Sequence, residues 1–163
     1  MNIYLVRHAI AEAVSSSDSE RSLTEDGFTQ AKMVASALKK TNMKLDLILS
    51  SPYLRAFQTA EEFSRAFQSK LEKLPQLAPG VNLDSLFKNL EGYETLNDIM
   101  LVGHEPDMGD ITARLIHGDR MFRMPYKKCQ VSCVSDCELP PVMPGILSWV
   151  ITPSLISGFQ KID

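Results

Sequence analysis

Short apolar runs alternate with amphipathic stretches along residues 2–117. The runs are typical of buried strands, whereas the stretches between them carry apolar residues at helical spacing. Strands are predicted at 2–7, 45–49, 98–102 and, from a weaker signal, 71–77. Helices are predicted at 24–40, 52–68, 83–90 and 106–117. This alternation predicts a three-layer α/β fold, with a mostly parallel central sheet flanked by helices.

Local signals mark the ends of the predicted helices. Thr24 is a favourable N-cap, and Glu25 and Asp26 in the first turn suit the helix dipole. Pro52 is expected in the first turn of its helix, where its missing N–H would have no partner. Gly118 is the expected C-terminal stop of the helix that precedes it.

Two regions depart from the alternating pattern. The segment 11–23 is polar and serine-rich, which predicts a loop. The segment 119–163 contains five prolines and favours β structure, with its clearest strands at 130–134 and 146–151.

Length and composition limit the possible classes of protein. A chain of 163 residues, 44% hydrophobic and 23% charged, suits a single domain over 1–163. The net charge is −3 and the Lys39–Lys40 and Lys127–Lys128 pairs are isolated, so we expect solvated lysines and no nucleic-acid partner. No apolar run approaches the roughly 18 residues of a membrane span. The N-terminal run also lacks the architecture of a signal peptide, so a cytoplasmic location is expected.

The three cysteines, Cys129, Cys133 and Cys137, recur every four residues. On a strand this spacing separates neighbouring thiols by about 13 Å, too far for a disulfide. Three thiols without a nearby histidine make a weak metal signal. We therefore expect reduced cysteines in a strand and no metal site.

Two of the three histidines directly follow predicted strands. Arg7 and His8 follow the run 3–6, and His104 follows the run 99–102 after one glycine. Open α/β sheets bind ligands beyond the carboxyl ends of their strands, so both rings are expected near one site. His117 instead ends a predicted helix, where a cation suits the dipole, and is expected to be structural.

Arg55 lies one turn into the helix predicted at 52–68, close enough to the same edge to point inward. Together with Arg7, His8 and His104 it would form a cationic pocket suited to an oxyanion such as phosphate. The N-termini of the helices at Pro52 and Pro106 would add favourable dipoles. A neutral imidazole can accept a phosphoryl group and pass it to water in two displacements that need no metal.

Three ordered motifs resemble those of the histidine phosphatase superfamily, also called phosphoglycerate mutase-like. They are Leu5-Val6-Arg7-His8-Ala9-Ile10-Ala11-Glu12, the segment 51–61 around Arg55, and Val102-Gly103-His104-Glu105-Pro106. The end of the first motif resembles the SixA-type branch, the phosphohistidine phosphatases. The resemblance implies that His8 is the phosphorylated nucleophile, that Arg7, Arg55 and His104 bind the phosphoryl oxygens, and that no cofactor is needed.

Two departures from the larger members of this family bear on the substrate. The interval 79–97 is too short for a large cap insertion, so the site would be open to a phosphate displayed on a protein. No acidic residue of this interval is expected at the site, although Glu91 and Glu94 lie within it, and the lack of an acid at the site disfavours ester hydrolysis because an alkoxide leaving group needs a proton. Both features favour phosphohistidine on a signalling protein, such as a phosphotransfer domain. Glu12 and Glu105 are the candidate proton donors.

Several alternatives remain open from the sequence. The chain could hydrolyse small phosphate esters or anhydrides, or it could bind phosphate without turnover. Glu12 could instead orient Arg7, and Glu105 could be a favourable charge near a helix start. The site residues also have structural alternatives: a core role for His8, a loop-capping role for His104, and salt bridges from Arg7 or Arg55 to Glu12, Glu61 or Glu62.

Overall fold

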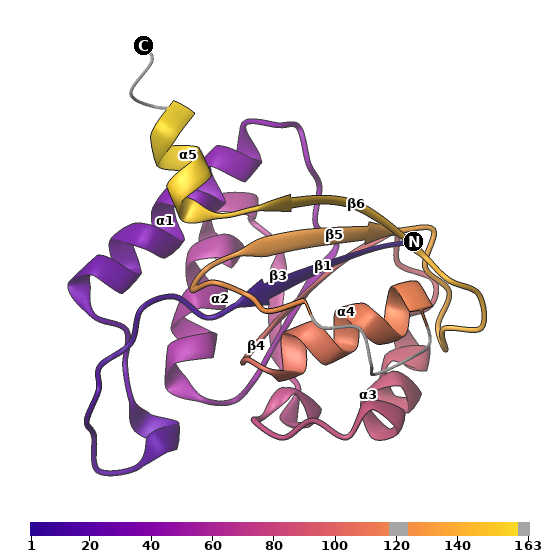
Figure 1. Ribbon diagram of the computed structural model, residues 1–163, viewed down its shortest axis with the longest axis horizontal. Helices are drawn as coiled ribbons and strands as arrows, with labels where there is room; N and C mark the ends of the chain where they lie inside the picture. Colours follow the sequence, from indigo (N-terminus) through magenta and orange to yellow (C-terminus); the bar gives the residue numbers. More distant parts are fainter. Residues whose placement is uncertain (118–123, 160–163) are drawn as a thin grey trace.

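One six-stranded sheet organises the computed structural model, which describes residues 1–117 and 124–159 (Figure 1). The strands lie in the order β3–β2–β4–β1–β5–β6. Their bounds are β1 Asn2–Arg7, β2 Leu47–Ser50, β3 Lys70–Lys73, β4 Asp98–Gly103, β5 Val131–Ser135 and β6 Ile146–Ile151. Only β5 runs opposite to the other five strands, so the prediction of a mostly parallel sheet is confirmed.

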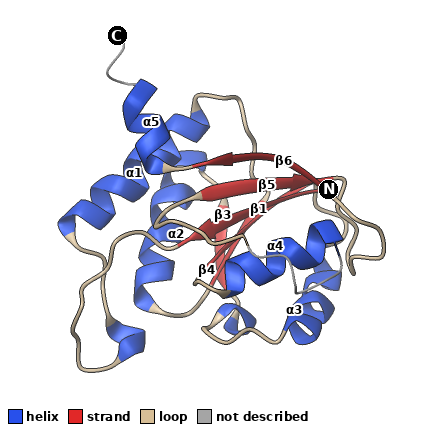
Figure 2. Cartoon of the chain, viewed as in Figure 1, coloured by secondary structure: helices blue, strands red, loops and turns tan. Residues whose placement is uncertain are grey.

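Helices cover both faces of this sheet and form the expected three layers (Figures 1 and 2). One face carries α1 (Glu25–Lys39), α2 (Leu54–Phe67) and α5 (Pro153–Phe159). The other face carries α3 (Leu83–Leu90) and α4 (Asp107–His117). Three short 3₁₀ segments, η1 (Asp18–Glu20), η2 (Pro75–Leu77) and η3 (Glu91–Tyr93), lie in the connections. The connection from β3 to β4 therefore contains small helices and no large cap.

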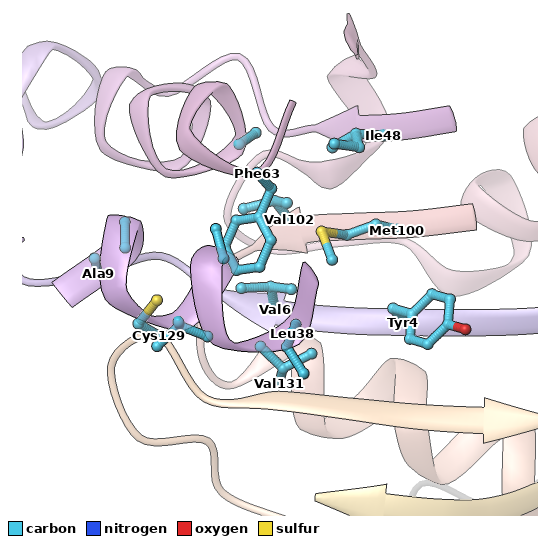
Figure 3. Packing of buried hydrophobic residues seen from close by; sticks show 14 of the residues in the cluster. Tyr4, Val6, Ala9, Leu38, Ile48, Phe63, Met100, Val102, Cys129 and Val131 are labelled. Atoms are coloured by element: carbon cyan, nitrogen blue, oxygen red, sulfur yellow. The ribbon is translucent and has the colours of Figure 1, made fainter. Parts of the chain in front are cut away.

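Alternating side chains of the central strands fill the two cores. Val6 and Met100 face α1 and α2, and the ring of Phe63 packs onto them (Figure 3). Leu5 and Leu101, which are adjacent to Val6 and Met100 along the two strands, are fully buried against α3 and α4. Burial on both faces explains why these strands read as continuous apolar runs in the sequence.

The predicted helix at 52–68 begins later than expected. Tyr53 is its N-cap and Leu54 its first residue, so Pro52 precedes the helix instead of lying in its first turn. The Ser51 hydroxyl accepts a hydrogen bond from the Tyr53 N–H at 3.2 Å, which holds this turn outside the helix. The prediction for Pro52 was wrong. The helix predicted from Pro106 likewise begins at Asp107.

Two further predictions need correction. The strand expected at 71–77 spans Lys70–Lys73, because Pro75 opens the 3₁₀ segment η2. The C-terminal region contains both expected strands, but it also contains α5, which the sequence analysis missed. Pro153 suits the first position of that helix. Gly118, the predicted helix stop, lies outside the described residues.

The cysteines are free and buried, although only Cys133 lies in a strand. Cys129 precedes β5 in a left-handed conformation with φ of 54°, and Cys137 follows β5. Burial raises the pKa of Cys129 and of Cys137 to about 12, so both thiols are inert at neutral pH. In residues 1–117 and 124–159, no helix has the length and apolar character needed to cross a membrane.

Gly27 fixes the path of the chain that leaves β1. A Cβ atom at this position would lie 1.9 Å from the Ile10 carbonyl oxygen, which itself accepts a hydrogen bond from the Thr24 N–H at 3.1 Å. Only glycine permits this close approach of α1 to the backbone two residues after His8.

We therefore expect Gly27→Ala to lower the free energy of unfolding by about 1–3 kcal/mol, as overpacking does. Urea unfolding measures this change. Gly158→Ala is the matched control, because Gly158 also lies in a helix and a Cβ there would have no heavy atom within 4 Å. Equal stabilities of the two variants would contradict the role of Gly27.

Candidate active site

The register of three parallel strands brings the three sequence motifs to one edge of the sheet. Arg7 at the end of β1 pairs with Gly103 at the end of β4, and Ser50 at the end of β2 pairs with Val102. The backbone N–H of His8 donates to the Gly103 carbonyl at 2.9 Å, and that of Ser51 donates to the Val102 carbonyl at the same distance. The residues after the strands are thus anchored side by side.

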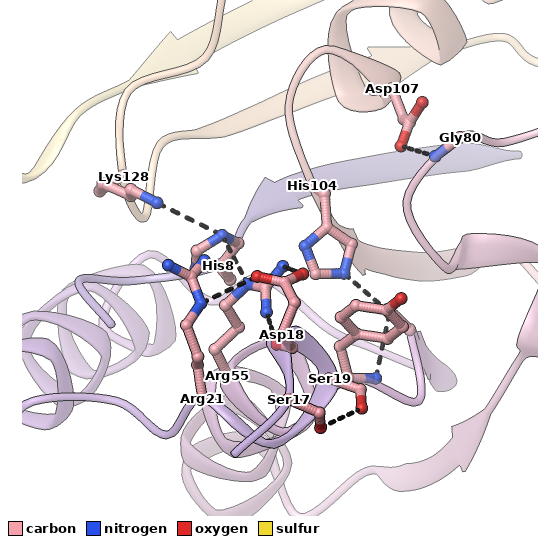
Figure 4. A network of polar contacts seen from close by, with 12 residues as sticks. His8, Ser17, Asp18, Ser19, Arg21, Arg55, Gly80, His104, Asp107 and Lys128 are labelled. Carbon is pink, nitrogen blue, oxygen red and sulfur yellow. Dashed lines mark hydrogen bonds and ion pairs between the residues drawn. The ribbon is translucent and has the colours of Figure 1, made fainter. Parts of the chain in front are cut away.

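His8 presents an unprotonated nitrogen to the centre of the pocket. Its Nδ1 lies 2.8 Å from the Ala9 carbonyl oxygen, which can only accept, so Nδ1 carries the proton. Arg55 Nε and Lys128 Nζ each lie 3.3 Å from Nε2, and both are donors (Figure 4). The lone pair is therefore on Nε2. The ring is 3% exposed, so its orientation is set by buried contacts.

His104 lies beside His8, with 5.2 Å between the ring centroids. Its Nε2 is 2.8 Å from the Ser51 hydroxyl, and the Tyr53 ring packs edge-on against it. Its Nδ1 is buried and has no hydrogen-bond partner. A buried polar nitrogen without a partner is unfavourable, so this atom is available to a ligand in the pocket.

Arg55 reaches the pocket from the first turn of α2, as expected, and is 4% exposed. Its Nη2 forms an ion pair with Asp18 Oδ2 at 3.0 Å, and its Nη1 donates to the Asp18 carbonyl. Asp18 also pairs with Arg21 Nε at 3.0 Å. Both arginines hold the pKa of Asp18 below its usual value, the hydrogen bond from Arg55 being the largest cause. The serine-rich segment 11–23 thus lies over the site.

Arg7 and Glu105 both contact the backbone of Tyr126. Arg7 Nη1 donates to the Tyr126 carbonyl at 2.5 Å, and its Nε is buried without a partner. Glu105 accepts a hydrogen bond from the Tyr126 backbone N–H and interacts electrostatically with Arg7. Burial raises the pKa of Glu105.

Glu12, the other candidate proton donor, is exposed, and its backbone N–H donates to the Ser22 carbonyl. The salt bridges that were considered as structural alternatives for Arg7 and Arg55 differ from the observed ion pairs. Arg55 pairs with Asp18, whereas Glu62 pairs with Arg65. In the part of the chain that the structure describes, no three His, Cys, Asp or Glu side chains are grouped so as to hold a metal ion.

Three residues of the site were not found from the sequence. Ser51 was noted only as part of a motif, and Asp18 only as part of a polar loop. Lys128 was expected to be solvated, which was wrong, because it is half-buried and contacts His8. A lysine directly before a buried strand carries no local signal of such a contact, whereas its neighbour Lys127 is exposed as expected.

Burial among cations keeps both histidines neutral. Desolvation, then Lys128, lowers the pKa of His8 to about 2. Desolvation and Arg55 lower the pKa of His104 to about 3. At neutral pH the pocket therefore combines permanently charged arginines with two neutral imidazoles. Side chains of this kind can bind an oxyanion, and a neutral imidazole among them can act as a nucleophile.

Comparisons with known proteins identify the family of this chain. Residues 3–79 match the model of the histidine phosphatase superfamily (branch 1). The phosphohistidine phosphatase SixA of Escherichia coli K12 is 30% identical over 94% of each chain. A SixA homologue of Haemophilus influenzae is 34% identical over 71% of this chain and 77% of the relative. The chain therefore belongs to the histidine phosphatase superfamily.

Within this superfamily the fold is similar to that of SixA. The structure of the protein histidine phosphatase SixA complexed with tungstate matches with a TM-score of 0.86 and 26% identity. The match covers 96% of this chain and 99% of that one. The phosphoglycerate mutase-like α/β fold without a large cap is thus confirmed.

The neutral histidines make the stability of the protein depend on pH. Their pKa values in the folded state lie below the unfolded value of about 6.5, so the unfolded chain binds more protons at acidic pH. The free energy of unfolding should therefore fall as the pH is lowered from 6.5 to 4.5. In His8→Gln, which removes one such ring, the fall should be smaller by about 2 kcal/mol.

Urea unfolding of both proteins at the two pH values measures this difference. Nitrogen chemical shifts of the His8 ring give an independent check, since Nε2 should remain unprotonated throughout the range. An identical pH dependence of the wild type and the variant would contradict the assignment.

Proposed function

We propose that this protein is a phosphatase that removes the phosphoryl group from phosphohistidine on another protein, by way of a phosphorylated His8. One observation carries the proposal: the Nε2 lone pair of His8 is directed by Ala9 into a pocket of cationic side chains. The similarity to SixA proteins, one of them described in complex with tungstate, supports a phosphoryl group as the ligand.

The first displacement transfers the phosphoryl group to His8. The Nε2 lone pair attacks phosphorus, the P–N bond of the substrate breaks, and its electron pair returns to the nitrogen of the leaving imidazole. Arg7 and Arg55 bind the phosphoryl oxygens, as does His104 through its unpartnered Nδ1. Preorganised donors of this kind supply most of the catalysis in phosphoryl transfer.

The second displacement releases phosphate. Water attacks phosphorus, the P–Nε2 bond breaks, and the electron pair returns to Nε2. The water gives up its proton to the phosphate or to solvent. Throughout the cycle the proton stays on Nδ1, which donates it in a hydrogen bond to the Ala9 carbonyl. When the P–Nε2 bond breaks, His8 is therefore again a neutral imidazole and ready for another cycle. In this scheme the side chains balance the charge, and no metal ion is required.

The carboxylates of the site favour a P–N bond over an ester. Glu105 is engaged with the Tyr126 N–H and Arg7, and Glu12 is exposed. Neither is hydrogen-bonded to His8 or His104. An imidazole that is already protonated leaves without a general acid, whereas an alkoxide does not. Of the two carboxylates, Glu105 is the better candidate proton donor, because burial raises its pKa.

The substrate is proposed to be a protein. The β3–β4 connection consists of short helical segments that pack with Leu77 and Leu86 in the core. Because this connection adds no cap beyond the segment 11–23, a histidine on a folded partner, such as a phosphotransfer domain, can approach His8.

We expect His8→Gln to lower the rate of phosphohistidine hydrolysis by more than about 1,000-fold, because the nucleophile is lost. Release of phosphate from a phosphohistidine-bearing protein measures the rate, before and after dialysis against EDTA. The wild type should also form an acid-labile phosphoryl-enzyme that His8→Gln does not form. His117→Gln, at the exposed end of α4, is the matched control and should retain the wild-type rate.

A substrate panel separates the alternatives. Higher kcat/KM for p-nitrophenyl phosphate or pyrophosphate than for the phosphohistidine protein would favour a small-substrate phosphatase. Oxyanion binding without turnover of any substrate would favour a binding module. Undiminished hydrolysis by His8→Gln would overturn the mechanism.

A further inference from the structure

Lys128 is a further cationic group beside Arg7, His8, Arg55 and His104, and it comes from outside the three motifs. It lies in the turn that precedes β5, far from the motifs in sequence. Its Nζ lies 3.3 Å from His8 Nε2, the atom that would carry the phosphoryl group (Figure 4). Arg55 Nε lies at the same distance from that atom.

The turn that carries Lys128 is fastened to the end of β1. The backbone N–H of Cys129 donates to the Arg7 carbonyl at 3.0 Å and also approaches the His8 carbonyl at 3.3 Å. Gln130 closes the turn, since its N–H donates to the Lys127 carbonyl and its side chain accepts from the Lys127 N–H. Cys129 itself is fully buried. These contacts fix the backbone that directs Lys128 toward the pocket and distinguish it from a solvated surface lysine.

The charges around Lys128 favour an anionic ligand, because Asp18 pairs with only two of the surrounding cations, Arg55 and Arg21. Burial, followed by the repulsion of Arg7, Arg55 and Arg21, lowers the pKa of Lys128 to about 8. An ammonium group kept among three guanidinium groups is unfavourable in the absence of a ligand. A phosphoryl group with two negative charges would relieve this repulsion. Its oxygens would accept hydrogen bonds from Arg55 and Lys128, which otherwise share the single lone pair on His8 Nε2.

We propose that Lys128 is a phosphoryl-binding residue whose ammonium group holds an oxygen of the phosphoryl group while that group is on His8. The role in turnover rests on the proposed function, whereas the binding of a tetrahedral oxyanion does not. In an in-line displacement the leaving group departs from the side opposite the nucleophile. Lys128 lies next to the nucleophilic atom, so it is placed to contact the transferring oxygens and not to protonate the leaving group.

The binding test uses tungstate as the probe and the wild-type chain with three variants. Lys128→Met removes the charge, Lys128→Arg keeps a charge that does not titrate, and Lys127→Met is the matched control at the exposed neighbour. At pH 7, calorimetric titration should give Lys128→Met a dissociation constant at least about 10-fold above that of the wild type, as loss of a charge-assisted hydrogen bond implies. Lys127→Met should bind nearly as the wild type does, and Lys128→Arg should bind more tightly than Lys128→Met because it keeps the charge.

The pH dependence of tungstate affinity tests the charge of Lys128 directly, because a purely structural role of Lys128 would not make the affinity depend on its protonation. Tungstate remains a dianion between pH 7 and 9.5, so its own charge is constant. The groups that face Lys128 are Arg7, Arg55 and Arg21, which stay charged, and His8 and His104, which stay neutral. Wild-type affinity should therefore weaken above about pH 8 as Lys128 loses its proton, whereas Lys128→Arg and Lys128→Met should show no such limb.

Thermal unfolding of each variant establishes that it is folded at the temperature of the titration. Tungstate affinity of Lys128→Met equal to that of Lys127→Met would overturn the proposal, as would an alkaline limb that persists in Lys128→Arg. Failure of the proposed function is recognised separately, because the wild type would then bind tungstate in a Lys128-dependent manner without hydrolysing the phosphohistidine protein.

Discussion

The pocket depends on the parallel register of β1, β4 and β2. Because Arg7 pairs with Gly103 and Ser50 with Val102, the residues after these strands emerge side by side. A slip of one residue would turn every side chain of the shifted strand to the opposite face of the sheet. Both faces are buried against helices, with Val6 on one side and Leu5 on the other, so such a slip would place side chains in the wrong core. The two cores thus hold the site in register.

The charges of the side chains that the register brings together determine the protonation of His8 and the kind of ligand that the site favours. Burial, and then the neighbouring cations, lower the pKa of the His8 imidazole. His8 therefore stays neutral, and hydrogen bonds at both of its ring nitrogens determine which one bears the lone pair. Asp18 offsets part of the positive charge through Arg55. The remaining excess of positive charge makes a multiply charged oxyanion a natural ligand of the pocket.

The elements with strong local signals were predicted closely. The apolar runs gave β1 and β6 with the observed bounds, and Thr24 caps α1 as expected. By contrast, α5 has seven residues, too few for a helical period to stand out in a region rich in proline. The late start of α2 follows from the Ser51 hydroxyl, whose hydrogen bond to the Tyr53 N–H was not evident from the position of Pro52.

The sequence by itself determined that Arg7 ends a strand, that His8 and His104 follow strands, and that Arg55 lies near the start of a helix, because these positions follow from local hydrophobic patterns. That set was enough to indicate an oxyanion site. Only the tertiary structure decided the tautomer of His8, the pairing of Arg55 with Asp18 and the burial of Lys128. The Asp18–Arg55 contact joins residues 37 positions apart along the chain, and the His8–Lys128 contact joins residues 120 positions apart. Electrostatic energies depend on distance and burial, and no local pattern specifies either of them.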